Sequence, residues 1–255
     1  MAATARRGKQ RLDAAMVERG LASGRDRARA LIMARDVIVD GQVATRPAAP
    51  IAPDASIEVK RPPPFVSRGG EKLAHALART RLNVRGRRCL DAGASTGGFT
   101  DCLLQHGAAS VVAVDVAYGE LAAKLRSDPR VEVRERTNAR ELEPLEPSVD
   151  LVTMDVSFIS IVTVLPAILR SLRPGGDVLL MVKPQFEAGR EQVETGGVVR
   201  DPVIHARAVA KVALACIEHG LRVRGVVRSP LVGPAGNREF FVWARRPAIE
   251  PEVAL

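Results

Sequence analysis

The chain has 255 residues, of which 46% are apolar and 26% charged, as in folded proteins of one or two domains. No apolar run approaches the ~18 residues that span a bilayer, and the N-terminus lacks the apolar segment of a secretory signal. The net charge of +9 favours a polyanionic partner, although arginine-rich composition bias also produces such a charge. The cysteines (Cys89, Cys102, Cys216) form no C-x-x-C pair, so we expect a cytoplasmic protein with neither disulfides nor a metal.

Residues 1–59 predict a small α+β domain. Apolar residues at helical spacing predict short helices at 11–20 and 25–34. The run Val37–Val39 followed by Asp40-Gly41 is typical of a β-hairpin. Three consecutive prolines at 62–64 favour an extended path, so we expect a linker at 60–66 and a second domain at 67–255.

This N-terminal pattern resembles the S-four domain, a small RNA-binding module. The matching residues are Arg11-Leu-Asp13, Arg19-Gly-Leu21, Arg25, Ala28, Leu31-Ile32 and Val37-x-Val39-x-Gly41. Gly24, Arg35 and Asp40 depart from the usual serine, glycine and asparagine. The resemblance implies RNA contacts from the second helix and the following turn. The candidate phosphate ligands are Arg11, Arg25, Arg27 and Arg29. The alternative is a solvated arginine face.

After the linker, strand and helix patterns alternate. Strands are predicted at 88–91, 111–115, 131–134, 150–155, 177–182, 221–228 and 239–244, and helices at 71–81, 97–107, 119–126, 160–172 and 202–219. This alternation predicts an α/β fold with a doubly wound, mostly parallel sheet. The last two strands have no helix between them, so we expect an antiparallel hairpin.

A glycine-rich turn, Asp91-Ala-Gly-Ala-Ser-Thr-Gly-Gly98, joins the first strand of this sheet to its helix. Glycines allow the backbone to approach a ligand closely. Asp115 ends the next strand, where a carboxylate commonly binds ribose hydroxyls. Asn138 follows the third strand and could face an adenine edge or cap a helix. The candidate cofactor-binding residues are therefore Asp91, Gly93, Ser95, Gly97, Gly98, Asp115 and Asn138.

Several ligands compete for this turn. It lacks both the G-x-G-x-x-G pattern of NAD sites and the G-K-[ST] ending of a phosphate loop. The run Gly93–Gly97 also matches the nucleophile elbow of α/β-hydrolases, but no His-Gly-Gly loop or suitably placed histidine accompanies it. S-adenosylmethionine has no phosphate and suits the turn best, with Asp91 as a possible acceptor for its ammonium group.

Four charged residues are predicted to share one sheet edge. Asp155 and Lys183 end parallel strands, and Lys72 lies in the helix that leads into the first strand. If the final strand is antiparallel, its first residue, Glu239, returns to the same edge, where ligands of open α/β sheets bind. Separate surface ion pairs are the alternative.

Lys72, Asp155, Lys183 and Glu239 resemble the Lys-Asp-Lys-Glu tetrad of FtsJ-type ribose 2′-O-methyltransferases, which have a Rossmann-like class I methyltransferase fold. The surrounding sequence is similar to the TlyA family, whose members are known as rRNA methyltransferases and also as hemolysins. The matching segments include 66–73, 90–101, 113–119, 135–140, 155–160, 182–190, 199–202 and 236–240. Ala117 departs from the family's usual glycine, and Phe65 stands where tryptophan is common.

The resemblance implies methyl transfer from S-adenosylmethionine to a cytidine 2′-hydroxyl of ribosomal RNA, without a metal. A neutral Lys183 could accept the hydroxyl proton, with Asp155 orienting it. Lys72 would supply a neighbouring cation or hold RNA phosphate, and Glu239 would orient both lysines. Arg68, in the first matching segment, joins the candidate RNA ligands. A membrane-active hemolysin and a non-catalytic RNA-binding ribosome factor are the alternative functions.

Overall fold

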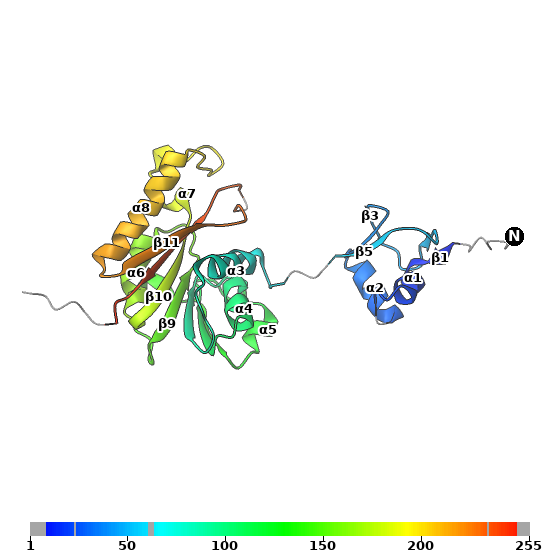
Figure 1. Ribbon diagram of the computed structural model, residues 1–255, viewed down its shortest axis with the longest axis horizontal. Helices are drawn as coiled ribbons and strands as arrows, with labels where there is room; N and C mark the ends of the chain where they lie inside the picture. The colour runs from blue at the N-terminus through cyan, green and yellow to red at the C-terminus, as the bar shows by residue number, and fades with distance from the viewer. Residues whose placement is uncertain (1–8, 23, 61–63, 234, 249–255) are drawn as a thin grey trace, which may run out of the picture. The chain divides into compact units, whose positions relative to one another are not determined.

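The computed structural model describes residues 9–22, 24–60, 64–233 and 235–248. The chain divides into two compact units, Met1–Pro64 and Phe65–Leu255, and each is described here by itself (Figure 1). The three residues 61–63 of the predicted linker lie outside the described ranges.

The N-terminal unit combines two short helices with small antiparallel sheets. Its elements are β1 (Gln10–Arg11), α1 (Leu12–Glu18), α2 (Arg25–Met33), β2 (Val37–Val39), β3 (Gln42–Val43), β4 (Pro50–Ile51) and β5 (Ile57–Val59). Strand β2 pairs with β3 and β5, and β1 pairs with β4, a pairing too short for sequence patterns to indicate. Asp40 and Gly41 have positive φ and form the predicted hairpin turn. Leu12, Met16 and Ile32 close a small core between the helices.

The second unit contains the alternation of strands and helices that the sequence predicts. Its elements are α3 (Arg68–Thr80), β6 (Arg88–Ala92), α4 (Gly98–Gln105), β7 (Ser110–Val114), α5 (Ala123–Arg126), β8 (Val131–Arg134), η1 (Ala139–Glu141), β9 (Val149–Met154), α6 (Ile161–Leu169), β10 (Leu172–Val182), α7 (Pro184–Glu187), η2 (Arg190–Gln192), α8 (Pro202–Glu218), β11 (Arg222–Arg228) and β12 (Phe240–Arg245).

These strands form one sheet in the order β11-β12-β10-β9-β6-β7-β8. Strands β6 to β10 are parallel, whereas β12 runs antiparallel between β10 and β11, which confirms the predicted hairpin. Val182 pairs with Phe240, so the end of β10 and the start of β12 lie side by side. Lys183 and Glu239 therefore meet at the edge of the sheet where the parallel strands have their carboxyl ends, which we call the carboxyl edge.

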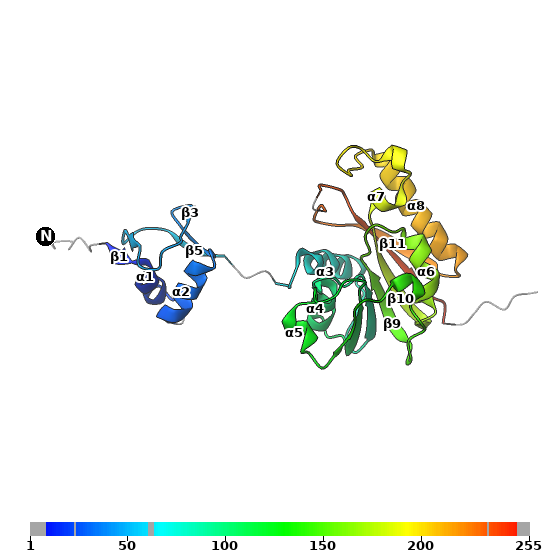
Figure 2. The same cartoon turned by 180° about the vertical axis from the view of Figure 1, so that it is seen from behind.

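Helices cover both faces of this sheet (Figures 1 and 2). Helices α6 and α8 pack on one face, over a core that includes Val152 and Val242. Helices α3 and α4 pack on the other face, over Leu151 and Phe241. Because both faces are covered, the central strands β7 and β9 are mostly buried and apolar, whereas β11 at the edge alternates with exposed arginines.

Two predicted helices are shorter than expected. The helix predicted at 119–126 is reduced to α5. The residues before α5 form other hydrogen bonds, because the Gly119 amide donates to Glu135 and the Ala122 amide donates to Thr96. Instead of 160–172, α6 ends at Leu169, and Leu172 already pairs with Val149 in the sheet.

Candidate active site

Two ion pairs occupy the carboxyl edge. The Lys72 ammonium lies 2.5 Å from Glu239 Oε2, and both side chains are buried. The Lys183 ammonium lies 2.7 Å from Asp155 Oδ1 and donates to Ser157 Oγ at 2.8 Å. The structure thus brings the four predicted tetrad residues to one edge as two adjacent pairs. Ser157, two positions after the strand-end carboxylate, was not among the predicted site residues.

Close contact between α3 and α4 places Lys72 at this edge. A Cβ on Gly98 would lie 2.2 Å from Ser67 Oγ and 2.9 Å from the Gly70 amide, so only glycine fits. Ser67 caps α3 by accepting from the Gly69 amide at 3.3 Å. Lys72 follows one turn later and reaches Glu239 across the edge. Gly98, the last glycine of the turn, therefore helps to position a tetrad residue as well as shaping the loop.

The glycine turn itself packs closely against the backbone that follows β9. Gly93 has φ of +85°, and a Cβ there would lie 2.7 Å from the Asp155 carbonyl oxygen. Gly97 has φ of +93°, and a Cβ would overlap Leu125. A side chain at Gly93 would push the turn away from the end of β9, and one at Gly97 would push it away from α5, so both glycines allow the turn to pack closely against the protein. The close approach to a ligand that the sequence predicts stays a prediction.

Two adjoining hollows open beside this turn, and together we call them the glycine-loop hollow. One has a volume of about 190 Å³ and is lined at one end by Lys72, Lys183 and Phe99. The other, of about 280 Å³, reaches Asp115 and Asn138. Both hollows share four lining residues, Gly93, Ser95, Asp155 and Ser157. An elongated ligand would therefore extend from the strand-end Asp115 to the tetrad.

Asp115 organises the loop from the end of β7. Its Oδ2 accepts the Ser95 amide at 2.7 Å and its Oδ1 accepts the Ala117 amide at 2.8 Å. Asn138 lies in the same hollow but also caps η1, accepting the Arg140 amide at 3.1 Å. The structure confirms the capping interpretation of Asn138, and the contact with an adenine edge stays a prediction.

Asp91 lies deeper than a ligand-binding role requires. It is fully buried, and its oxygens accept the hydroxyls of Thr100 at 2.7 Å and Thr153 at 3.2 Å. It is not among the residues that line the glycine-loop hollow. Burial is the main cause that raises the pKa of Asp91 to about 7, although the threonine hydroxyls oppose the shift.

This pKa predicts a pH-dependent stability. The folded state retains a proton that the unfolded chain, with an aspartate pKa of 3.8, releases, so stability falls as pH rises from about 4 to about 7. We expect Asp91→Asn to remove this fall. Urea unfolding followed by the fluorescence of Trp243, the single tryptophan, measures it in this unit. Parallel pH profiles of variant and wild type would contradict the assignment.

A third hollow, of about 410 Å³, meets the tetrad from the other side and is lined by Lys183 and Glu239. Phe158 and Phe186 also line it, and the centroids of their rings are 5.1 Å apart. Phe158 is 91% exposed and has φ of +64°, a conformation that non-glycine residues rarely adopt. We call this the phenylalanine hollow. Sequence patterns did not indicate either ring, although each lies three residues after a tetrad residue, Asp155 or Lys183.

The predicted RNA-binding arginines fall into two groups. Arg11 is hydrogen-bonded to the buried Asp13 at 2.7 and 3.0 Å, and Arg29 lies 3.6 Å from the same carboxylate. The bonds from Arg11 lower the pKa of Asp13. Arg25 and Arg27 are exposed on α2, and no ion pair involves them in the described part of the chain.

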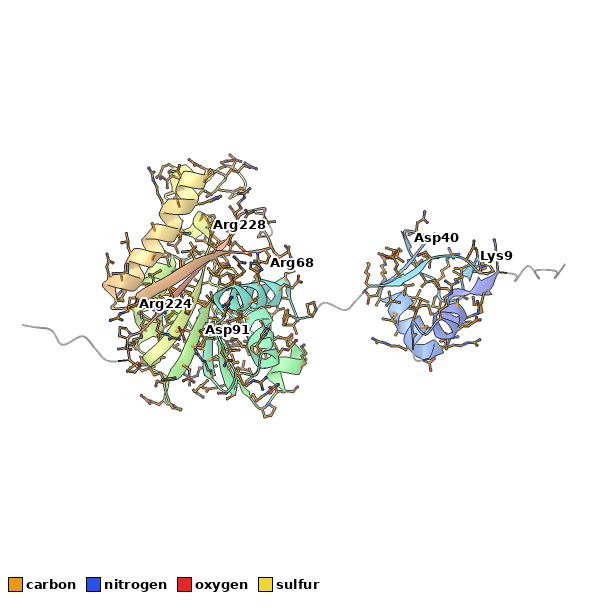
Figure 3. The ribbon with its side chains drawn as sticks, in the orientation of Figure 1. Lys9, Asp40, Arg68, Asp91, Arg224 and Arg228 are labelled. Atoms are coloured by element: carbon orange, nitrogen blue, oxygen red, sulfur yellow. The ribbon has the colours of Figure 1, made fainter. Side chains whose placement is uncertain are left out.

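Arg68 belongs to the second unit, at the start of α3 (Figure 3). Its guanidinium donates to the Val232 carbonyl at 3.0 Å and is otherwise exposed. Arg68 precedes Lys72 by about one turn of α3. Within the described ranges, no group of three or more metal-ligating side chains comes together.

Comparisons with known proteins agree with this geometry. Residues 65–246 match the FtsJ-like methyltransferase model and residues 10–57 match the S4 domain. The chain is 52% identical to the 16S/23S rRNA (cytidine-2′-O)-methyltransferase TlyA of Mycobacterium tuberculosis, over 92% of this chain and 89% of the relative. It is also 38% identical to Hemolysin A of Brachyspira hyodysenteriae, over 90% and 97%.

Solved structures show the same architecture. A hemolysin-like protein of Streptococcus thermophilus is 40% identical with a TM-score of 0.72, covering 94% of this chain and 89% of that one. An S-adenosylmethionine-dependent methyltransferase of Listeria monocytogenes is 16% identical with a TM-score of 0.54, over 71% of this chain and 99% of that one, and it supports the fold alone.

Fold and site together define an FtsJ-like methyltransferase with a Rossmann-like, mostly parallel sheet and an N-terminal S4 domain. More specifically, the chain belongs to the TlyA family of these enzymes. This result confirms the fold class and the family that the sequence predicts. The described helices include none long and apolar enough to cross a membrane.

Proposed function

We propose that the protein transfers a methyl group from S-adenosylmethionine to the 2′-hydroxyl of a cytidine in ribosomal RNA, in the cytoplasm. One observation carries the proposal: the Lys183 ammonium lines both the glycine-loop hollow and the phenylalanine hollow. A methyl donor in the first hollow and a ribose in the second would meet at Lys183 and Asp155. The FtsJ-like family match and the names of the relatives support the same reaction.

The glycine-loop hollow fits S-adenosylmethionine. When bound, this cofactor supplies an electrophilic methyl group on a sulfonium centre. Asp115 would accept its ribose hydroxyls, and Gly93 and Ser95 line the hollow beside it. Asn138 would contact the adenine edge with the amide nitrogen that its capping role leaves unused. Asp91 would act indirectly, by holding Thr100 and Thr153 beneath the loop.

The tetrad would handle the proton of the acceptor hydroxyl. Lys183 would accept that proton in its neutral form, and Lys72 would supply a second positive charge at the same edge for the RNA phosphate. Asp155 orients the Lys183 ammonium through the 2.7 Å contact and stabilises it once protonated. Glu239 keeps Lys72 in place. Positioning of the two reactants in line supplies much of the remaining rate.

Asp115→Ala tests the cofactor assignment. The change removes an acceptor for the ribose and frees the Ser95 and Ala117 amides, so we expect the affinity for S-adenosylmethionine to fall about tenfold or more. Isothermal titration calorimetry measures the effect, and Glu120→Ala, an exposed carboxylate nearby in the sequence, is the control. Tight binding of NAD in place of S-adenosylmethionine would overturn the assignment.

We further propose a division of labour in which residues 1–59 supply RNA affinity and residues 67–255 the chemistry, joined through a linker at 60–66. The S4 match and the exposed Arg25 and Arg27 support the first part. All four tetrad residues lie in the second unit.

The double change Arg25→Ala/Arg27→Ala tests this division. Because phosphate contacts release counterions, each lost contact flattens the salt dependence of RNA binding by about 0.7–0.9 log units. Arg29 is left in place, since it contacts the buried Asp13 and its loss would disturb the domain. Filter binding to ribosomal RNA at several salt concentrations measures the slope. An unchanged slope and an unchanged affinity would show that α2 does not contact RNA.

Mapping of 2′-O-methylated cytidines in ribosomal RNA, in cells with and without the protein, tests the function as a whole. We expect at least one site to disappear, and to return with the wild type but not with Lys183→Ala. Identical maps would overturn the proposal. Leakage of liposomes exposed to the purified protein would instead favour the hemolysin alternative that the name of one relative suggests.

A further inference from the structure

A basic groove lies between α3 and the edge strand β11, away from both hollows of the active site. It has a volume of about 480 Å³. Its polar and charged lining residues are His75, Arg79, Thr80, Arg224 and Arg228, with Trp243 beside them and no carboxylate in the lining. Figure 3 shows Arg224 and Arg228 on the β11 side of the sheet. We call it the α3–β11 groove.

Its arginines are available to a ligand. Arg79, Arg224 and Arg228 are exposed, and within the described ranges none of them takes part in an ion pair. Many other arginines of this unit are paired, for example Arg87 and Arg245 with Asp177. Unpaired positive charges that share one hollow attract a ligand carrying several negative charges.

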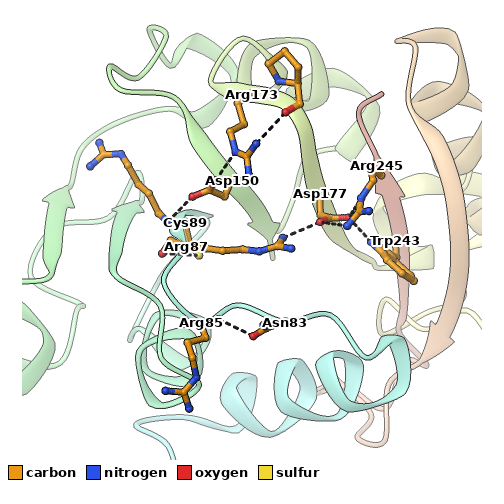
Figure 4. Close-up of polar contacts among 11 residues, drawn as sticks. Asn83, Arg85, Arg87, Cys89, Asp150, Arg173, Asp177, Trp243 and Arg245 are labelled. Atoms are coloured by element: carbon orange, nitrogen blue, oxygen red, sulfur yellow. Dashed lines mark hydrogen bonds and ion pairs between the residues drawn. The ribbon is translucent and has the colours of Figure 1, made fainter. Parts of the chain in front are cut away.

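The aromatic residue in the groove is fixed in position. Trp243 Nε1 donates to Asp177 Oδ1 at 2.9 Å, and the fully buried Asp177 also accepts from Arg87 and Arg245 (Figure 4). The Arg224 guanidinium carbon lies 5.9 Å from the centre of the Trp243 ring. The ring therefore positions Arg224 through a cation–π contact and leaves its N–H groups free to donate.

Protection of the sheet edge explains only part of this arrangement. Charged side chains on an edge strand such as β11 discourage pairing with another sheet. That role accounts for Arg224 but not for Arg79 and His75, which lie on a helix and face the same hollow. Convergence of basic groups from two elements on one hollow indicates a ligand.

We propose that the α3–β11 groove binds the phosphate backbone of a second segment of the RNA substrate. The arginines would contact consecutive phosphates, as guanidinium groups do in fork-shaped hydrogen bonds. The groove would position the RNA without reading its sequence, because phosphate contacts carry no base information. This inference rests on the proposed function, since it assumes an RNA substrate.

The double change Arg79→Gln/Arg224→Gln tests the groove. We expect binding of ribosomal RNA to weaken about tenfold and the salt slope to flatten by about 1.4–1.8 log units. S-adenosylmethionine binding and the rate at saturating RNA should be unchanged. The matched control is Arg85→Gln/Arg207→Gln, which removes the same charge from two exposed arginines outside the groove.

Crosslinking gives a second, structural measurement. The native cysteines are buried, and burial raises the pKa of Cys89 to about 12 and of Cys216 to about 11, so an introduced surface cysteine is labelled selectively. Val226→Cys places a photoreactive label in the groove, and Leu214→Cys places it on exposed α8. We expect RNA crosslinks from position 226 only.

The outcomes separate the groove from the function. If the wild type methylates ribosomal RNA while the groove variant matches its control and position 226 yields no crosslinks, the groove proposal is wrong and the function stands. If the wild type neither binds nor methylates ribosomal RNA, the proposed function itself fails. If the groove variant changes the oligomeric state of the protein but not its RNA binding, the groove is an interface between copies of the chain. That result would overturn the RNA proposal.

Discussion

Lys183→Ala is expected to reduce the rate of methyl transfer by about 10²–10⁴-fold, because positioned proton-transfer groups contribute effects of this size. The Lys183 ammonium contacts Asp155 at 2.7 Å and Ser157 at 2.8 Å. Lys183→Ala therefore removes the amino group that lies between the glycine-loop hollow and the phenylalanine hollow. RNA and cofactor binding should stay within a few-fold. Single-turnover assays with saturating RNA measure the rate, and a variant that keeps more than about a tenth of the activity would refute the assigned role.

Lys183→Arg separates the two ways in which Lys183 can act. Arginine keeps the positive charge but stays protonated at any accessible pH, so it cannot accept the hydroxyl proton. If Lys183 is a base, the arginine variant should be as inactive as the alanine variant. If it stabilises charge electrostatically, the arginine variant should recover much of the rate. Lys124→Ala, a more exposed lysine of the same unit, is a control for the loss of one lysine.

Lys72→Met is expected to destabilise the methyltransferase unit by about 3–5 kcal/mol, because it leaves the Glu239 carboxylate buried without its partner. The Lys72 and Glu239 side chains are 9% and 2% exposed, and their charged atoms are 2.5 Å apart. Glu239→Gln should cost a similar amount through the unpaired Lys72. Urea unfolding followed by Trp243 fluorescence measures this unit, since the single tryptophan lies in β12.

The double variant Lys72→Met/Glu239→Gln completes a thermodynamic cycle. With no buried charge left, we expect it to be more stable than the sum of the single changes predicts, by about 1–3 kcal/mol. Methyl transfer should remain low in the double variant, because the edge loses the positive charge of Lys72 although stability returns. Additive free energies of unfolding would show that the pair contributes no coupling. Recovery of activity together with stability would show that Lys72 has only a structural role.

Sequence patterns alone indicated the architecture and the outline of the site. Apolar runs and helical spacing follow from backbone geometry within a few residues, so the alternation of strands and helices could be read directly. Because parallel strands end at one edge, Asp115, Asp155 and Lys183 could be placed together, and the missing helix before β12 placed Glu239 with them. The glycine turn and the S4 pattern needed no tertiary information either.

Only the tertiary structure decided which charges pair and which side chains line the hollows. Lys72 and Glu239 are separated by 167 positions and meet because β12 reverses direction beside β10. Asp91 ends the strand that leads into the glycine turn, yet it is buried and accepts two threonine hydroxyls. Side-chain partners depend on how close the elements pack and which rotamers that packing allows, and periodicity in the sequence carries neither quantity. The rings of Phe158 and Phe186 and the basic groups of the α3–β11 groove converge for the same reason, from segments that local patterns treat as unrelated.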